Sequence, residues 1–385
     1  MASNLGTVAP VTGANALYSS LDSTASGPVR TAADEPVRLA HGSPWANRYA
    51  LAPMTNKQSY PDGTLSEMEY EWLVARGRGG FGVVKTCAAY VADTGRTWTG
   101  QLGIASDEHM PGLTRLALGL QATGTMSLVQ LHHGGLRADS GLAGTILAPF
   151  DDPESGATAM SGAQVQQMVA DFVAAAVRAE RAGFDGVEVH GAHGFLLAQF
   201  LDRRNQRADG YGGGLEHRMR FLVEVLAGIR AATGDRFQLG VRLSPEAKGT
   251  PLEEGREIAG QILTGGVADF VDMSLRDVYA TPHYAGADSL LIEDFSTLPR
   301  GRTVLSVTGR VRSAEDAAWC LAKGADVVAI GTGAILHHDF AERALAEPGF
   351  KARSLPVSRD VLRSELVGPP FQDYLAQDWD DLVAG

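Results

Sequence analysis

Eight short apolar runs alternate with stretches of helical periodicity from about residue 48 onward, and this alternation strongly limits the folds open to the chain. Alternating strands and helices favour parallel pairing through right-handed crossovers. Eight such units without a second composition regime predict a single closed (β/α)₈ barrel rather than two domains. The expected strands cover residues 49–53, 82–86, 127–131, 186–190, 238–243, 270–274, 303–307 and 326–331.

Polar residues and glycines mark the ends of the expected helices. Ser161 and Gln164 have the spacing of a capping box, and Gly183 stands where that helix would end in a left-handed conformation. Ser313 opens a later helix that Gly324 closes. The alternative fold, a doubly wound open sheet, usually has a glycine-rich turn after its first strand. The chain has no such turn there, which favours the barrel.

Composition excludes several classes of protein. The chain has 45 acidic and 33 basic side chains, a formal charge of −12, which argues against a nucleic-acid partner and against docking on an anionic membrane. No apolar stretch is long enough to span a membrane, and the first residues lack the pattern of a secretory signal. The two cysteines, Cys87 and Cys320, suggest no disulfide framework. We therefore expect a cytoplasmic protein.

The first part of the chain differs from the rest. It is rich in Ala, Ser, Thr and Gly and has few large apolar residues. We expect a flexible N-terminal arm over residues 1–34 and one barrel domain over residues 35–385. A homo-oligomer is compatible with this organisation, and the sequence does not fix the oligomeric state.

Functional groups of (β/α)₈ barrels lie at the carboxyl ends of the strands. The sequence places polar, sulfur-containing or conformationally special residues at seven of these ends. They are Pro53, Met54 and Thr55 at the first strand, Cys87 at the second, Gln130 at the third, His190 and His193 at the fourth, Arg242 at the fifth, Gly309 and Arg310 at the seventh, and Gly331 and Thr332 at the eighth.

Glycine-containing loops follow the seventh and eighth strands, where such barrels commonly bind phosphate. Gly309, Gly331 and Gly333 would let backbone N–H groups approach a phosphate closely. Tight turns between a strand and a helix also need glycine. These residues therefore fit either a phosphate-binding site or simple turns.

The sequence His190-Gly-Ala-His193 follows a strand, and its two imidazoles suit several chemistries. They could ligate a metal, transfer protons, donate hydrogen bonds to a ligand oxygen, or cap backbone carbonyls. No H-E-x-x-H motif supplies further metal ligands. Gln130 and Arg242 are polar residues in apolar strands, where burial requires a partner. An amide suits the edge of a heterocycle, and Arg242 would pair with either a ligand or an internal acid.

Four segments carry a resemblance to a known family: ALAPMTN (50–56), VQLHHGG (129–135), VEVHGAHGFLLAQFL (187–201) and RADGYGGGLEHRMRF (207–221). With the glycine loops after strands seven and eight, they cover roughly residues 35–375. The chain resembles the Old Yellow Enzyme family of FMN-dependent NAD(P)H:flavin oxidoreductases. The resemblance implies one barrel with FMN at its carboxyl-terminal mouth and NADPH or NADH as reductant.

The resemblance also implies a role for each residue at the strand ends. Pro53, Met54 and the backbone at Cys87 would lie against the flavin ring, with the Thr55 hydroxyl near the C4 oxygen. Gln130 would pair with the pyrimidine edge, and Arg242 would lie near N1 and O2. The phosphate would be held by Gly309, Arg310, Gly331 and Thr332. Relatives commonly carry an arginine after the eighth strand, and here Arg310 would compensate for it. His190 and His193 would donate hydrogen bonds to a substrate carbonyl or a phenolic oxygen.

The implied reaction has two halves. NADPH or NADH reduces FMN, and the flavin then passes hydride to the β-carbon of an α,β-unsaturated carbonyl compound, a small enone. Relatives usually supply the proton from a tyrosine two residues after the second histidine, and this chain has Phe195 there. Tyr90, Tyr279 and Tyr284 are the candidate replacements.

Three alternatives stay open at the level of the sequence. Because of Phe195, an FMN enzyme of the same fold could isomerise its substrate or convert a specialised metabolite. A metal-dependent barrel hydrolase could use His190 and His193, although we expect no metal. A barrel could also bind a ligand without redox turnover.

Overall fold

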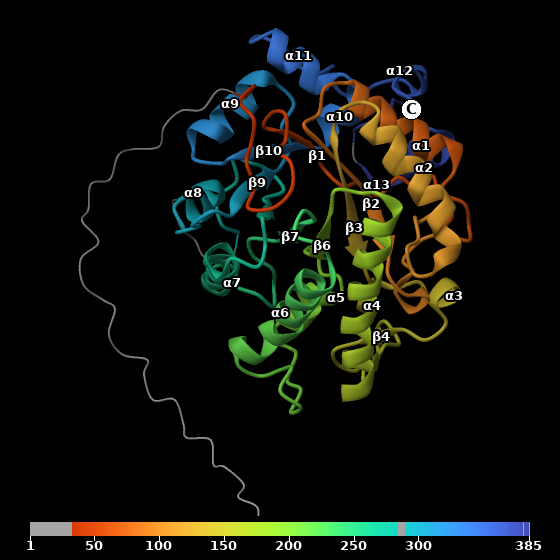
Figure 1. The fold of residues 1–385 in the computed structure, drawn as a ribbon, viewed down its shortest axis with the longest axis vertical. Helices are drawn as coiled ribbons and strands as arrows, with labels where there is room; N and C mark the ends of the chain where they lie inside the picture. Colours follow the sequence, from red (N-terminus) through yellow and green to blue (C-terminus); the bar gives the residue numbers. More distant parts are fainter. Residues whose placement is uncertain (1–32, 284–288, 380, 385) are drawn as a thin grey trace, which may run out of the picture.

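The computed structural model describes residues 33–283, 289–379 and 381–384, and eight parallel strands close into a barrel at its centre (Figure 1). Residues 1–32 of the predicted arm lie outside the described residues. Around the barrel the strands follow the order β1-β10-β9-β8-β7-β6-β3-β2, which confirms the predicted (β/α)₈ fold. Their bounds are β1 Tyr49–Leu51, β2 Val83–Tyr90, β3 Met126–His132, β6 Gly186–Gly191, β7 Gln238–Leu243, β8 Phe270–Ser274, β9 Val304–Thr308 and β10 Val327–Ile330.

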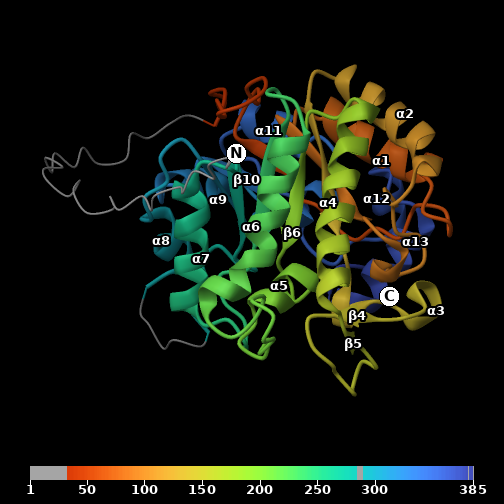
Figure 2. The same cartoon turned by 60° about the horizontal axis from the view of Figure 1, so that its bottom comes forward.

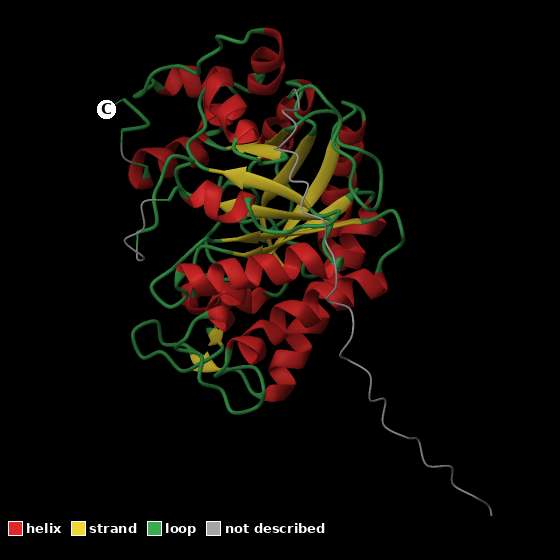
Figure 3. Ribbon diagram, turned by 90° about the vertical axis from the view of Figure 1, so that its left-hand side faces the viewer, coloured by secondary structure: helices red, strands yellow, loops and turns green. Residues whose placement is uncertain are grey.

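Helices surround the strands on all sides, as the secondary-structure colouring shows (Figure 3). Their bounds in the described chain are α1 Glu67–Arg78, α2 Met110–Gln121, α3 Ser140–Ala143, α4 Gly162–Ala182, α5 Leu196–Leu201, α6 Leu215–Ala232, α7 Leu252–Gly265, α8 Leu291–Ser296, α9 Ala314–Ala322, α10 Thr332–Leu336, α11 Phe340–Ala346, α12 Arg359–Ser364 and α13 Pro369–Asp378.

The predicted helix signals act as expected. The Ser161 side chain accepts from the backbone N–H of Gln164, and the Gln164 side chain accepts from Ser161 in return, so the capping box opens α4. Gly183 ends α4 with a φ of 96°, a left-handed conformation that favours glycine. Ser313 caps α9 in the same way as Ser161 caps α4, by accepting from a backbone N–H three residues on.

Strand β2 extends four residues beyond the predicted end. The register between β2 and β3 shifts between Lys85 and Ala88, and pairing then continues to Tyr90. Cys87 therefore lies inside the strand, where its thiol donates to Glu69 Oε1 of α1 at 2.7 Å. The thiol faces the helix layer rather than the mouth of the barrel.

Aromatic and aliphatic side chains fill the lower half of the barrel. Trp45 lies against Phe270 with ring centroids 5.3 Å apart, and its indole N–H donates to Gln238 Oε1 at 2.8 Å. Gly240 makes room for this packing, since a Cβ at that position would stand 2.0 Å from the Phe270 ring.

Helices α4 and α6 run side by side along the outside of β6 (Figure 2). Phe221 of α6 stacks on Phe200 of α5 at 4.2 Å and meets Phe172 of α4 at 6.3 Å. This packing holds α5, and with it the loop between β6 and α5, against the barrel. That loop carries the two histidines predicted from the sequence.

Two features lie outside the eight repeats. Strands β4 (Leu147–Ala148) and β5 (Thr158–Ala159) form a small separate sheet. The chain after α13 returns to the body of the protein through a bridge between Val357 and Val383. In the part of the chain that the structure describes, no helix combines the length and the apolar character needed to cross a membrane.

Candidate active site

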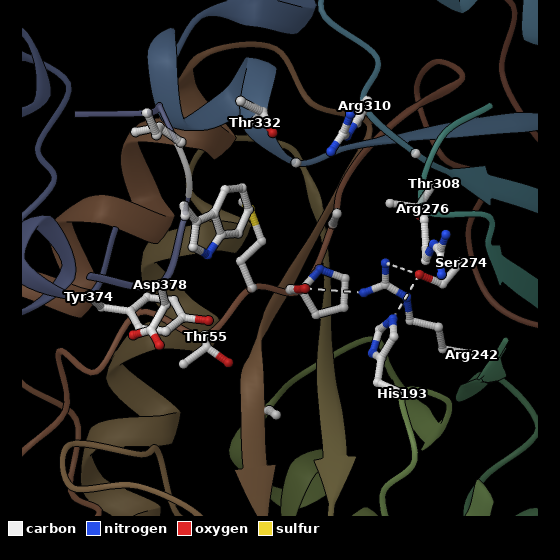
Figure 4. Close-up of a pocket in the computed structure, with 18 of the residues that line it drawn as sticks. Thr55, His193, Arg242, Ser274, Arg276, Thr308, Arg310, Thr332, Tyr374 and Asp378 are labelled. Atoms are coloured by element: carbon white, nitrogen blue, oxygen red, sulfur yellow. Dashed lines mark hydrogen bonds between the residues drawn. The ribbon is translucent and has the colours of Figure 1, made fainter. Parts of the chain in front are cut away.

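A cavity of about 970 Å³ opens at the carboxyl ends of the barrel strands (Figure 4). Nearly all the residues that the sequence singles out line this cavity. They are Pro53, Met54, Thr55, Gln130, His190, His193, Phe195, Arg242, Gly309, Arg310, Gly331 and Thr332.

Cys87 is not among the lining residues, because the register shift in β2 turns its side chain toward α1. Ala88 takes the expected place at the cavity. Burial and the neighbouring Glu69 raise the pKa of the Cys87 thiol well above its usual value. The thiol therefore stays protonated and acts as a core group.

Arg242 projects from the end of β7 into the cavity wall and is only 4% exposed. Its Nη1 donates to the Pro53 carbonyl at 3.1 Å and its Nη2 to Ser274 Oγ at 3.3 Å. Its Nε lies 3.6 Å from Asp272 Oδ2 and has no hydrogen-bond partner among the described residues. The guanidinium is thus fixed in place by two of its five N–H groups.

A fully buried group of charges lies beneath Arg242. Lys85 forms ion pairs with Glu188 and, at 2.9 Å, with Asp272, and all three side chains are inaccessible. Burial opposes the charge on Asp272, yet Lys85 and Arg242 lower its pKa to about 2, whereas burial raises the pKa of Glu188. The cluster balances the charge of Arg242 and fixes the polar floor of the cavity.

Gln130 of β3 is anchored by the same cluster. Its amide nitrogen donates to Glu188 Oε1 at 2.8 Å. Its amide oxygen accepts from none of the described residues, so Gln130 offers an acceptor to a ligand in the cavity. Sequence reasoning identified the residue but not the anchor that orients it.

The two predicted histidines contact each other. His190 Nε2 lies 2.9 Å from His193 Nδ1, and His193 Nε2 lies 2.8 Å from Ser274 Oγ (Figure 4). Burial and the positive charge of Arg242 lower the pKa of His193 to about 3, and burial lowers that of His190 well below its usual value. Both imidazoles are therefore neutral near pH 7.

Phe195 packs beside the histidine pair at the cavity wall. Its ring centroid lies 4.4 Å from that of His132 and 5.0 Å from that of His190. The guanidinium of Arg137 lies 4.6 Å over the Phe195 ring and donates to the His193 carbonyl at 2.7 Å. The position thus contributes packing, and its side chain carries no transferable proton.

The candidate replacements for a tyrosine donor lie elsewhere. Tyr90 donates to the carbonyl of Asp62, and Tyr279 donates to Asp316; neither lines the cavity. Tyr284 lies outside the described residues.

The C-terminal segment forms a cavity wall that sequence reasoning missed. Tyr374 and Asp378 of α13 face the cavity on the side opposite His193 (Figure 4). Lys57, after β1, lies 4.6 Å over the Tyr374 ring and 4.0 Å from Asp378, which ties this wall to the barrel. Other lining residues that the sequence did not indicate are Trp98, Ser274, Arg276, Arg312, Leu355, Trp379, Asp381 and Leu382. The aromatic residues at the end of the chain were the available signal.

Four non-glycine lining residues have a left-handed backbone. The φ angles are 58° for His193, 63° for Arg276, 51° for Arg310 and 59° for Asp381. Such conformations are uncommon for these residue types and gather at functional sites, where the surrounding structure enforces them.

No group of three or more His, Cys, Asp or Glu side chains is arranged to hold a metal ion in residues 33–283, 289–379 and 381–384. The histidine pair instead uses its ring nitrogens on each other and on neighbouring side chains.

Comparison with known proteins assigns this chain to a family. The family described as NADH:flavin oxidoreductase / NADH oxidase matches residues 35–347. A probable NADH-dependent flavin oxidoreductase of Bacillus subtilis is 35% identical over 310 residues, which is 77% of this chain and 83% of that protein. The chain belongs to the NADH:flavin oxidoreductase / NADH oxidase family.

Other relatives of this NADH:flavin oxidoreductase extend the comparison. The Old Yellow Enzyme homologue of Zymomonas mobilis has the same fold with a TM-score of 0.74 and 25% identity, covering 88% of this chain and 99% of that one. The NADH:fumarate oxidoreductase of Klebsiella pneumoniae is 33% identical over 81% of this chain, but the match spans only 36% of that longer protein. The chain is therefore a flavin oxidoreductase of the Old Yellow Enzyme type, with FMN as cofactor and NADH or NADPH as reductant.

The cavity of this flavin oxidoreductase fits FMN. Gln130 offers an unused amide oxygen, and Nη1 and Nη2 of Arg242 each keep a second N–H at the cavity wall, which suits the polar edge of the flavin ring. The Arg310 guanidinium has no partner among the described residues and lines the cavity beside Gly331 and Thr332, which suits a phosphate. Gly309 also has a packing role, since a Cβ there would stand 2.9 Å from the backbone nitrogen of Asp277.

A buried histidine beside the site should make this flavin oxidoreductase sensitive to acid. Burial lowers the pKa of His133 from 6.5 to about 3, so the unfolded chain binds a proton that the folded chain does not. Stability from this group is complete above pH 6.5 and is lost as the pH falls. Between about pH 7 and pH 5, protonation of this histidine in the unfolded chain should lower the free energy of unfolding by about 2 kcal/mol. The His133→Gln variant should therefore lose about 2 kcal/mol less than the wild type over this range. Urea unfolding of both proteins at the two pH values measures the difference. An equal loss in both proteins would contradict this expectation.

Proposed function

We propose that this enzyme reduces the activated C=C bond of a small α,β-unsaturated carbonyl compound. One observation carries the proposal: a pair of neutral histidines faces the same cavity as the fixed Arg242 and the free amide oxygen of Gln130. This arrangement provides hydrogen-bonding groups for a substrate oxygen beside groups suited to a flavin edge.

The chain's own residues would polarise and orient the substrate. His193 and His190 are neutral, so each carries one N–H that can be redirected to a substrate oxygen. A hydrogen bond to that oxygen stabilises the negative charge that develops on it during reduction. The bound flavin supplies the hydride. The positive charge of Arg242 lies where the polar edge of the flavin would be held.

A proton must reach the α-carbon of the substrate, and Phe195 cannot supply it. The cavity opens to solvent at the barrel mouth, so water is the proton source that fits this site. The same feature supports the second candidate function, isomerisation of a specialised substrate without net reduction.

Product analysis tests the proposal. Under nitrogen, the holoenzyme with NADPH or NADH and 2-cyclohexenone is expected to form cyclohexanone in an amount equal to the nicotinamide oxidised. Nicotinamide oxidation that occurs only with oxygen, without saturated ketone, would contradict the proposal.

Phe195→Tyr separates reduction from isomerisation. A tyrosine hydroxyl beside the histidine pair adds a proton donor, and a positioned acid typically accelerates a proton transfer by about 100-fold or more. We expect the steady-state rate of 2-cyclohexenone reduction to rise by at least about tenfold. An unchanged rate would mean that proton supply at this position does not limit the reaction.

A further inference from the structure

A second cavity lies beside the loop that carries His190 and His193. It has a volume of about 260 Å³ and is lined by residues of α5, α7, the ends of β6 and β7 and the loops nearby. Among the described residues, none lines both this cavity and the larger one. Gly191 and Gly194 of the histidine loop form part of its wall. The apolar side chains of the wall are Leu136, Ala198, Leu201, Leu243, Ala247 and Ile258.

The apolar wall of the second cavity is largely shielded from solvent. Leu201, Leu243 and Ile258 are each at most 4% exposed. A Cβ on Gly194 would meet no described atom within 4 Å apart from its chain neighbours, which agrees with open space beside that residue. Protein interiors hold few voids larger than a water molecule. Since a dry cavity of ~150 Å³ binds benzene, this one has room for about ten non-hydrogen atoms.

One basic side chain on this wall, Arg137, has no acidic partner in the part of the chain that the structure describes. The two acids of the wall are already engaged: Asp202 pairs with Arg204 at 2.9 Å, and Glu246 accepts from the backbone N–H of His283 at 2.5 Å. Arg137 is exposed, which places it at the rim of the cavity. A guanidinium binds a carboxylate through two parallel hydrogen bonds. The wall therefore suits a molecule with an apolar body and a carboxylate.

The same wall holds the main chain of His193. The backbone N–H of His193 donates to Ser244 Oγ at 3.0 Å, and its carbonyl accepts from Arg137 Nη1 at 2.7 Å. Ser244 and Arg137 both line the second cavity. His193 has a left-handed backbone with a φ of 58°, which the surrounding structure must enforce. A carboxylate attracts a guanidinium more strongly than a neutral carbonyl does, so a bound carboxylate would weaken the hold of Arg137 on His193.

We propose that the second cavity binds a small carboxylate with an apolar body, and that the bound molecule loosens the main chain at His193. The apolar body fills the space lined by α5 and α7, and the carboxylate draws the Arg137 guanidinium away from the His193 carbonyl. Occupancy of one cavity thereby changes the other, which defines an effector site. The binding does not depend on which reaction the larger cavity performs.

The first measurement titrates the FMN-loaded protein with 3-phenylpropanoate, which matches the cavity in size, by isothermal calorimetry. We expect a dissociation constant of about 0.1 mM. The neutral 3-phenylpropanamide has the same shape and should bind about tenfold more weakly. In Arg137→Met the two compounds should bind alike. Absence of measurable binding to the wild type, or a preference for the carboxylate that survives in Arg137→Met, would overturn the proposal.

Two matched substitutions locate the bound carboxylate. Ala198 lines the second cavity, so Ala198→Leu should fill part of it and weaken the binding of 3-phenylpropanoate by at least about tenfold. Ala227 is exposed on α6 and lines neither cavity, so Ala227→Leu should leave the affinity unchanged. The FMN content and urea unfolding of both variants check that they are folded. Equal affinities of the two variants would overturn the site.

Hydrogen exchange measured by mass spectrometry tests the link to His193. In the wild type, saturating 3-phenylpropanoate should raise the exchange rate of the backbone amides of residues 191–195 by about fivefold or more. In Arg137→Met the bond to the His193 carbonyl is already absent, so the ligand should not change this rate. Unchanged exchange in the ligand-bound wild type would overturn the link. Failure to reduce 2-cyclohexenone would defeat the proposed function but leave these binding and exchange results standing.

Discussion

Lys85→Met is expected to lower the free energy of unfolding by about 3–5 kcal/mol, because it removes the ammonium that pairs with two buried acidic side chains. The Lys85 ammonium pairs with Glu188 and Asp272, and none of the three side chains is accessible to solvent. Methionine has a similar length but no charge. Urea unfolding at pH 7 measures the change.

An exposed ion pair provides the matched control. Lys323 pairs with Glu293 on the surface, so Lys323→Met should cost no more than about 1 kcal/mol. The double variant Lys85→Met/Glu188→Gln removes one of the stranded charges and should recover part of the loss. Equal, small effects of the two single variants would contradict the structural role assigned to the buried cluster.

His190→Ala and His193→Ala are each expected to weaken the binding of p-cresol by about 10–100-fold while FMN stays bound. Each substitution removes an imidazole that faces the cavity, and neither residue belongs to the glycine loops or to the β7 end that fit the cofactor. Titration of the FMN-loaded protein with p-cresol measures the affinity, and release by heat measures the FMN content.

Another buried histidine, His133, separates ligand binding from general loss of structure. His133 follows His132 at the end of β3 but does not line the cavity, and it bonds with Thr94 and Gly135 instead. His133→Gln should therefore leave the affinity for p-cresol unchanged. Loss of FMN from both alanine variants would contradict the role given to His190 and His193.

The barrel and most of its cavity residues could be predicted because both depend on local pattern. Apolar runs define the strands, and the carboxyl ends of parallel strands in a closed barrel meet at one mouth. Thr55, Gln130, Arg242 and Thr332 therefore reach one cavity although they are far apart in the sequence. The Cys87 side chain contacts Glu69 instead of lining the cavity, and the register shift inside β2 behind this leaves no mark on the hydrophobic pattern. The role of the Cys87 backbone at the flavin ring stays a prediction.

The remaining features depend on contacts between distant segments. The wall formed by Tyr374 and Asp378 requires the C-terminal helix to return to the barrel mouth, which no local periodicity specifies. The hydrogen-bonded chain through His132, His190 and Ser274 requires strands β3, β6 and β8 to present those side chains at one level. The sequence indicated His190 and His193, but only the packed barrel shows their hydrogen bonds with His132 and Ser274.

The most direct test of the proposed reaction follows the visible absorbance of the bound FMN in the absence of oxygen. NADPH or NADH should bleach this absorbance, and 2-cyclohexenone added afterwards should restore it while cyclohexanone forms. Absorbance that returns only when oxygen is admitted, with no saturated ketone, would contradict the conclusion that this cavity reduces an activated C=C bond.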